Sequence, residues 1–128
     1  MGNALITRKG GGKNIWFVNL TKSNFTNVVS EVIDTKTSSE KKYSIFGEAH
    51  KWNSNRWMNV DFEGSNDGST WVKIKSVSNG ADKSNIYGGN NLFTSTGTVN
   101  YRWLRLKSTV QADNSGAAGV TATLIVEE

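Results

Sequence analysis

The sequence contains no cysteine, no proline and a single histidine, and it has no long apolar run. The absence of cysteine excludes disulfides, thiolate metal sites and cysteine nucleophiles, so packing must supply the stability. One histidine, His50, cannot form a metal cluster alone, and beside a loop it is more typical of a surface side chain than of a general base. No run approaches the ~18 residues of a spanning helix, and MGNALITRKGGGK lacks the apolar segment of a signal peptide. We therefore expect neither membrane insertion nor ordinary secretion.

The composition indicates one globular domain. The chain has 128 residues, of which 36% are hydrophobic and 20% charged, a balance typical of a soluble protein with one core. The net charge is +4, but lysines and arginines are interspersed with acids and no nucleic-acid motif accompanies them. Nucleic acid is therefore not the favoured partner.

The candidate chemical groups are sparse. Asp61 and Glu63 are two apart on one predicted strand, but outward carboxylates on a strand usually face water or a lysine such as Lys73. GGGK at 10–13 does not meet the spacing of a phosphate loop, since Asn14 follows the lysine. No ligand spacing supports a calcium site at Asp61, Asp67 or Asp82. We predict a protein that is not an enzyme and has no cofactor or metal.

Alternation with a period of two predicts an all-β fold. It is clear from Lys41 onward, where short apolar-alternating stretches are separated by Gly, Asn, Ser and Asp clusters. The predicted strands include KYSIFGEAH (42–50), RWMNVDFEG (56–64), TWVKIKSV (70–77), NYRWLRLKS (100–108) and VTATLIVEE (120–128). A further strand is predicted at 27–35, whereas NIWFVNL at 14–20 is apolar but too short to assign.

The stretch EGSNDGSTW at 63–71 predicts a tight β-hairpin. Asn66, Asp67 and Gly68 tolerate positive φ, and Ser65, Ser69 and Thr70 can bond exposed backbone groups. We expect residues 56–63 to pair with 70–77. Antiparallel strands would then place the 50–55 and 78–98 loops at one end of a sandwich, and the 64–69 turn and the 109–119 loop at the other.

The first 14 residues predict an extended N-terminal arm that precedes a domain spanning 15–128. Gly10 to Gly12 cannot hold a regular element without entropic cost. The arm is either a loose terminus or a strap that orders against a neighbouring subunit, and its basic Arg8 and Lys9 are candidate interface residues.

Two groups of aromatic residues are candidate binding sites. One predicted loop end collects His50, Trp52, Tyr87, Asn90 and Asn91, and rings with amides suit a polar ring-shaped ligand such as a sugar, unless the rings fold back onto the core. The other group lies opposite the aliphatic side of the strands and comprises Trp57, Trp71, Tyr101, Trp103 and Phe46. Three alternatives remain open for this group: residues such as Trp16 cover it within the same subunit, a neighbouring subunit covers it, or it binds a ligand.

Two segments carry a resemblance to a known family. VDFEGSNDGSTWVKI at 60–74, followed by YRWLRLKST at 101–109, resembles the galactose-binding, discoidin-like modules of bacteriophage virion proteins. MGNALITRKGGG at 1–12 is similar to the short leader of some phage structural proteins. The chain departs from secreted discoidin domains because it lacks their terminal cysteine pair and a signal peptide, which favours assembly in the host cytoplasm into a virion.

The resemblance implies a jelly-roll or discoidin-like antiparallel β-sandwich. It further implies a non-enzymatic virion structural protein, such as a capsid decoration, head fibre, tail or baseplate component, that binds other virion proteins and forms homo-oligomers such as trimers. The alternative function is a carbohydrate-binding module that recognises a host glycan.

Overall fold

A computed structural model describes residues 5–9, 13–22, 28–51, 58–77, 89–110 and 118–128. These residues contain no helix, which confirms the all-β prediction. They form ten strands: β1 (Leu5–Lys9), β2 (Lys13–Lys22), β3 (Val28–Val29), β4 (Ile33–Asp34), β5 (Lys41–Lys51), β6 (Met58–Ser65), β7 (Val72–Ser76), β8 (Gly89–Val99), β9 (Trp103–Val110) and β10 (Ala118–Glu127).

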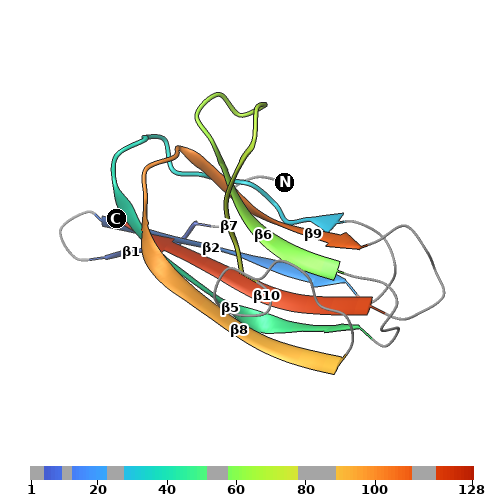
Figure 1. Cartoon of the computed structure of the whole chain (residues 1–128). Coiled ribbons are helices and arrows are strands. Elements are labelled where there is room, and N and C mark those ends of the chain that lie inside the picture. Colours follow the sequence, from blue (N-terminus) through green and yellow to red (C-terminus); the bar gives the residue numbers. More distant parts are fainter. Residues whose placement is uncertain (1–4, 10–12, 23–27, 52–57, 78–88, 111–117) are drawn as a thin grey trace.

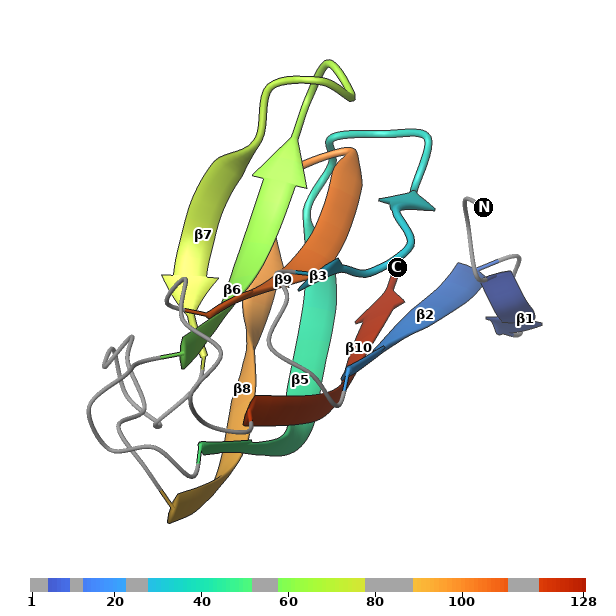
Figure 2. The same cartoon turned by 90° about the vertical axis from the view of Figure 1, so that its right-hand side faces the viewer.

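The strands form two antiparallel sheets that pack as a β-sandwich (Figures 1 and 2). Sheet A has the order β1-β2-β10-β5-β8, and sheet B has the order β3-β9-β6-β7, with β4 also paired to β9. The rings of Tyr43 in sheet A and Phe62 in sheet B meet with their centroids 4.7 Å apart. The core therefore lies between the two sheets.

Period-two alternation determines which side chains enter that core. On β6, Met58, Val60 and Phe62 are buried, and on β9, Leu104 and Leu106 are buried. Sheet A contributes alternate residues in the same way, among them Ile45, Ala122 and Leu124. Neighbours in sequence point away from the core because successive side chains of a strand leave opposite faces.

The predicted hairpin is present, with β6 paired to β7. Its register shifts after Phe62, since Phe62 pairs with Lys75 but Glu63 pairs with Lys73. Ile74 is thus the extra residue of a β-bulge, which brings its side chain back toward the core. Val72, which pairs with Gly64 beyond the bulge, is 45% exposed.

Three elements differ from the sequence-based prediction. The stretch considered too short to assign is part of β2, ten residues long. The single strand predicted at 27–35 is two short strands, β3 and β4, separated where Ser30 bonds with the backbone of Leu106. Residues 89–98 of the predicted 78–98 loop belong to β8, which pairs with β5 along eleven residues.

The 109–119 loop was predicted to lie at the same end of the sandwich as the 64–69 turn, and this prediction is wrong. The additional strand β8 carries the chain across the sandwich once more and so moves the loop to the other end. Val110 pairs with Met58 at the start of β6, and Ala118 pairs with Lys51 at the end of β5. The residues that flank 111–117 therefore lie at the same end as those that flank 52–57, opposite the β6–β7 turn (Figure 2).

Residues of the predicted arm contribute to sheet A. β1 pairs with β2 and forms the outermost strand of that sheet. Asn14 is tied to the other terminus, because its N–H donates to Glu128 Oε1 at 2.8 Å and its carbonyl accepts from the Glu128 N–H at 3.1 Å.

Candidate functional site

The described aromatic residues that were predicted to form an interface lie on both sheets. Phe46 lies on β5 in sheet A and is 49% exposed. Trp71 and Trp103 lie beside the same end of β6 in sheet B, because Trp103 pairs with Ser65 and Trp71 directly precedes Val72, the partner of Gly64. Among the described residues, Phe46 therefore lies on a different sheet from Trp71 and Trp103.

The corner of the β6–β7 hairpin is built by its own side chains. Asp67 Oδ1 accepts the N–H groups of Ser69 at 2.8 Å and Thr70 at 2.7 Å, and Ser65 Oγ accepts the N–H of Gly68 at 2.9 Å. Only Gly68 has positive φ, at 79°, among the described corner residues. Asn66, predicted for its tolerance of positive φ, instead accepts the backbone N–H of Arg102 through Oδ1 at 2.9 Å.

Trp103 is partly buried. The Arg102 guanidinium lies 4.1 Å from the centroid of its ring, and a Cβ placed on Gly68 would lie 3.4 Å from ring atom Cε2. Arg102 is held in turn by Asp34 through two bonds, Nε to Oδ1 at 2.8 Å and Nη2 to Oδ2 at 3.0 Å. The ring therefore supports the hairpin corner.

Trp71 lies under a second arginine. The Arg105 guanidinium is 4.0 Å from the centroid of the ring, and its Nε donates to Glu63 Oε1 at 2.7 Å. Glu63 is buried, so its pairing with Arg105 offsets the cost of a buried charge. This cation–π stack joins β9 to the residue that precedes β7 and stabilises sheet B.

Tyr101 belongs to the core side, contrary to the side predicted for it. It precedes β9, and its ring packs over Gly64 together with Ile74. The reason is that alternation along β9 does not extend to Tyr101, since the strand begins at Trp103.

The carboxylates of Asp61 and Glu63 have separate partners. Asp61 Oδ1 accepts the hydroxyl of Ser76 at 2.7 Å, and burial raises the pKa of Asp61 above its ordinary value. By contrast, the pKa of Asp34 is lowered, first of all by its bond from Arg102, and that of Asp67 by the backbone N–H groups it accepts. These groups therefore serve the fold of sheet B.

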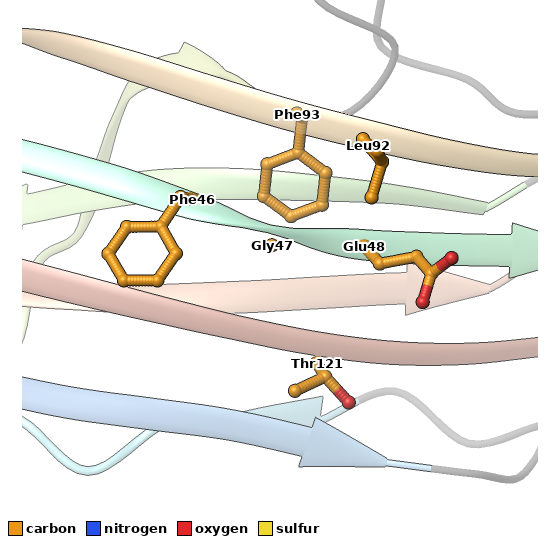
Figure 3. Close-up of a pocket in the computed structure, with 6 residues that line it drawn as sticks. All are labelled: Phe46, Gly47, Glu48, Leu92, Phe93 and Thr121. Atoms are coloured by element: carbon orange, nitrogen blue, oxygen red, sulfur yellow. The ribbon is translucent and has the colours of Figure 1, made fainter.

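A hollow of about 510 Å³ lies on the outer face of sheet A. Figure 3 shows Phe46 and Glu48 on β5, flanked by Leu92 from β8 and Thr121 from β10. Register places Leu92 opposite Glu48 and Thr94 opposite Phe46. Leu92 is 81% exposed, so an apolar side chain, an aromatic ring, a carboxylate and a hydroxyl share one open surface.

Sequence reasoning missed Leu92 and Thr121 as site residues. Leu92 fell in a segment predicted as loop, although Thr94, Thr96 and Thr98 continue its alternation and threonine favours strands. That alternation alone did not indicate a strand, because the positions between the threonines include Ser95 and Gly97. Thr121 was on a correctly predicted strand, but its neighbours across the sheet become known only from the pairing of β10 with β5.

The residues predicted to bind a glycan are partly brought together. Backbone pairing places His50 opposite Asn90, and Asn91 opposite Ala49. Along the strands, the backbone pair His50–Asn90 lies two residues from Glu48 and Leu92, which line the hollow. Trp52 and Tyr87, and the interface candidate Trp57, lie outside the described residues.

Arg8 and Lys9 lie on β1, where their backbones pair with Asn14 and Lys13. β1 is separated from β5 by β2 and β10 in the order of sheet A. The two basic residues are therefore not neighbours of Phe46.

Within the described part of the chain, no group of three or more His, Cys, Asp or Glu side chains is placed to hold a metal ion. In the same residues no helix has the length and apolarity needed to cross a membrane. Comparison of the chain with protein-family models, curated proteins and solved structures finds no match in any of the three.

Proposed function

We propose that the chain is a non-enzymatic structural protein of a bacteriophage virion, with a jelly-roll or discoidin-like sandwich. In this proposal the outer face of sheet A attaches it to neighbouring proteins of the capsid or tail after synthesis in the host cytoplasm. The resemblance of residues 60–74 and 101–109 to discoidin-like virion modules supports the virion role. The structural observation that carries the attachment role is the exposure of Phe46 and Leu92 around the hollow.

The placement of these side chains favours binding over self-coverage. Phe46 and Leu92 come from adjacent strands of a sheet whose other face is buried in the core. Apolar side chains gathered on one rigid surface mark interaction sites more often than scattered ones do. The threonines around them supply hydroxyls that can bond to a partner at the rim of such a contact.

Particles lacking the protein provide the test. Purified chain is mixed with virions produced without this gene, and bound protein is measured by co-sedimentation. We expect saturable binding that Phe46→Ala weakens at least tenfold, because the ring is removed from the centre of the contact. Val72→Ala is the matched control, since Val72 is 45% exposed on the other sheet. Equal binding by both variants would exclude this face, and no binding to capsid or tail would exclude the virion role.

A carbohydrate-binding function is the second candidate, and the chemistry of the hollow favours it specifically. An aromatic ring, the Glu48 carboxylate and the Thr121 hydroxyl surround one open depression, and sugars present both apolar faces and hydroxyls. A glycan array with wild type and Glu48→Gln tests it, with binding by wild type and loss by the variant as the expected result. An array without any signal would exclude the carbohydrate-binding function, and it would not contradict the proposed attachment to a virion.

A further inference from the structure

The two sheets differ in how their edges are protected against pairing with other strands. β7 has five residues and carries Lys73 and Lys75, while β1 has five residues and carries Arg8 and Lys9. β3 and β4 have two residues each. Charge and short length are the usual devices by which proteins blunt sheet edges. These edges are therefore poor templates for strand addition.

The remaining edge, β8, has neither device. It is eleven residues long, reads GNNLFTSTGTV, and contains no charged residue and no proline. The uncharged run extends from Ser84 to Tyr101, although one residue in five is charged over the whole chain. No other strand of the described residues pairs with β8 on the side away from β5.

The strand is held in a fixed position by the core. Phe93, Ser95 and Val99 are buried on its inner face, and its register with β5 is unbroken from Lys51–Gly89 to Lys41–Val99. On the outer face Leu92, Thr94, Thr96 and Thr98 are exposed. An edge strand presents alternate N–H and C=O groups outward, so β8 offers a long, preorganised template at no further ordering cost.

We propose that β8 pairs antiparallel with β8 of a second copy of this chain about a two-fold axis, joining the two A sheets into one. A second copy is the partner that fits, because copies with net charge +4 repel one another except where the chain is uncharged. Antiparallel pairing of a strand with itself is isologous, so one surface satisfies both subunits. In a register centred on Thr94 or Ser95, Leu92 lies opposite Thr96 or Thr98 of the second copy.

The surroundings of the edge suit such a dimer. Leu92 on each copy would gain a cross-strand threonine, and aliphatic or β-branched pairs on one sheet face stabilise antiparallel strands. Phe46, one strand inward and in the same row as Thr94, stays on the outer face. This inference rests on the proposed function, because it names the partner of one edge of the sheet that the proposed function uses for attachment. Its experiment uses no virion. The failure of the dimer and the failure of the virion role can therefore be told apart.

Solution mass measured by sedimentation equilibrium over a wide concentration range tests the pairing. We expect wild type to form a discrete dimer, and Thr96→Lys to raise the dimer dissociation constant at least tenfold, because each lysine then lies opposite uncharged Leu92 or Thr94 of the second copy and places a charge in the contact. Thr21→Lys is the matched control, since Thr21 is an exposed threonine on the same sheet, on β2. A monomeric wild type, an open-ended series of oligomers, or equal effects of both substitutions would overturn the proposal.

Cysteine cross-linking reports the contact directly, because the chain contains no native cysteine. In the register centred on Thr94, Thr94→Cys alone should give disulfide-linked dimers on mild oxidation. In the register centred on Ser95, a mixture of Thr94→Cys and Thr96→Cys should do so, since directly opposite Cβ atoms lie about 4.5–5.5 Å apart. Thr21→Cys should not. Dimers that form in solution but cross-link at none of the β8 positions would show that another surface associates, and the proposal would be wrong.

Discussion

Asp67 stabilises the hairpin corner through its charge as well as its shape. It accepts two backbone N–H groups and the Ser65 hydroxyl, and these bonds lower its pKa below the ordinary value of 3.8. Folding therefore favours the charged carboxylate. Its contribution is present above the unfolded pKa and is lost as the pH falls through the folded pKa.

We expect Asp67→Asn to lower the free energy of unfolding at pH 7 and to reduce its fall on acidification below about pH 4. Asparagine keeps an acceptor oxygen but not the charge. Urea titrations at several pH values measure both effects. Asp34, whose pKa is also lowered, retains part of the acid sensitivity, so the variant should flatten the pH profile without abolishing it.

Asp61→Asn is the control, because we expect it to change the free energy of unfolding in the opposite direction. Burial raises the pKa of Asp61, so folding disfavours its charged form and the carboxylate costs stability at neutral pH. The variant should be more stable than wild type at pH 7, and the difference should shrink as the pH falls and the wild-type carboxyl takes up its proton. Parallel pH profiles for both variants would contradict this assignment.

Gly64 is required by packing. A Cβ at this position would lie 2.6 Å from Cγ of Tyr101 and 2.9 Å from Cδ1 of Ile74. We therefore expect Gly64→Ala to lower the free energy of unfolding by about 1–3 kcal/mol, the usual cost of overpacking. In a Tyr101→Ala background the penalty should shrink because the ring is gone. An unchanged urea midpoint in the single variant would mean that Tyr101 moves aside at no cost.

At the scale of strands, sequence predicted those elements whose inward residues are large and apolar. β5, β6, β9 and β10 have this pattern, with buried Ile45, Phe62, Leu106 and Leu124 as examples. The hairpin was also predictable, because turn residues are concentrated at one point. What alternation could not give was the bulge at Ile74, since it depends on the partner strand.

β8 was missed for a physical reason. Its inward positions include Ser95 and Gly97, which look unlike a core. Gly97 pairs with Tyr43, and a Cβ there would lie 3.1 Å from the Tyr43 ring. The ring from β5 thus fills space that a side chain of β8 would otherwise occupy. Such compensation between strands is invisible in one strand's sequence, so the candidate site at Leu92 was invisible too.

Arg105 links β9 to β6 and β7. Its guanidinium stacks on Trp71 and bonds Glu63, and both charged side chains are largely buried. We expect Arg105→Lys to lower the free energy of unfolding by about 1–2 kcal/mol, because an ammonium loses the planar stacking and the fixed geometry of the bond. Thermal or urea unfolding measures the change.

Arg102→Lys is the matched control for that substitution. Arg102 also stacks on a tryptophan, but it is more exposed, and Lys36 supplies Asp34 with a second cation at 3.2 Å. Its replacement should therefore cost less, since exposed ion pairs contribute little. A larger loss in Arg102→Lys than in Arg105→Lys would show that Trp103 and not Trp71 depends more on its arginine.

At the scale of the whole molecule, the arginine–tryptophan stacks and the exposed Phe46 and Leu92 lie on different sheets. Sheet B carries the arginine stacks and the carboxylates that pair with them on its outer face. The outer face of sheet A near β8 carries Phe46, Leu92 and threonines. This asymmetry could not be predicted from sequence, because it depends on which strands enter which sheet.

The predicted boundary between the arm and the domain gives a whole-molecule prediction. β1 pairs only with β2 among the described strands, so removal of residues 1–12 should leave a folded sandwich. Removal of residues 1–14 should cost about 1–2 kcal/mol more, because the carboxylate and the N–H of Glu128 then lose their hydrogen bonds to the backbone of Asn14. Circular dichroism and urea unfolding of the two truncated chains test this difference. Equal midpoints would mean that the Asn14–Glu128 bonds contribute nothing, whereas unfolding of both chains would make β1 part of the domain rather than an arm.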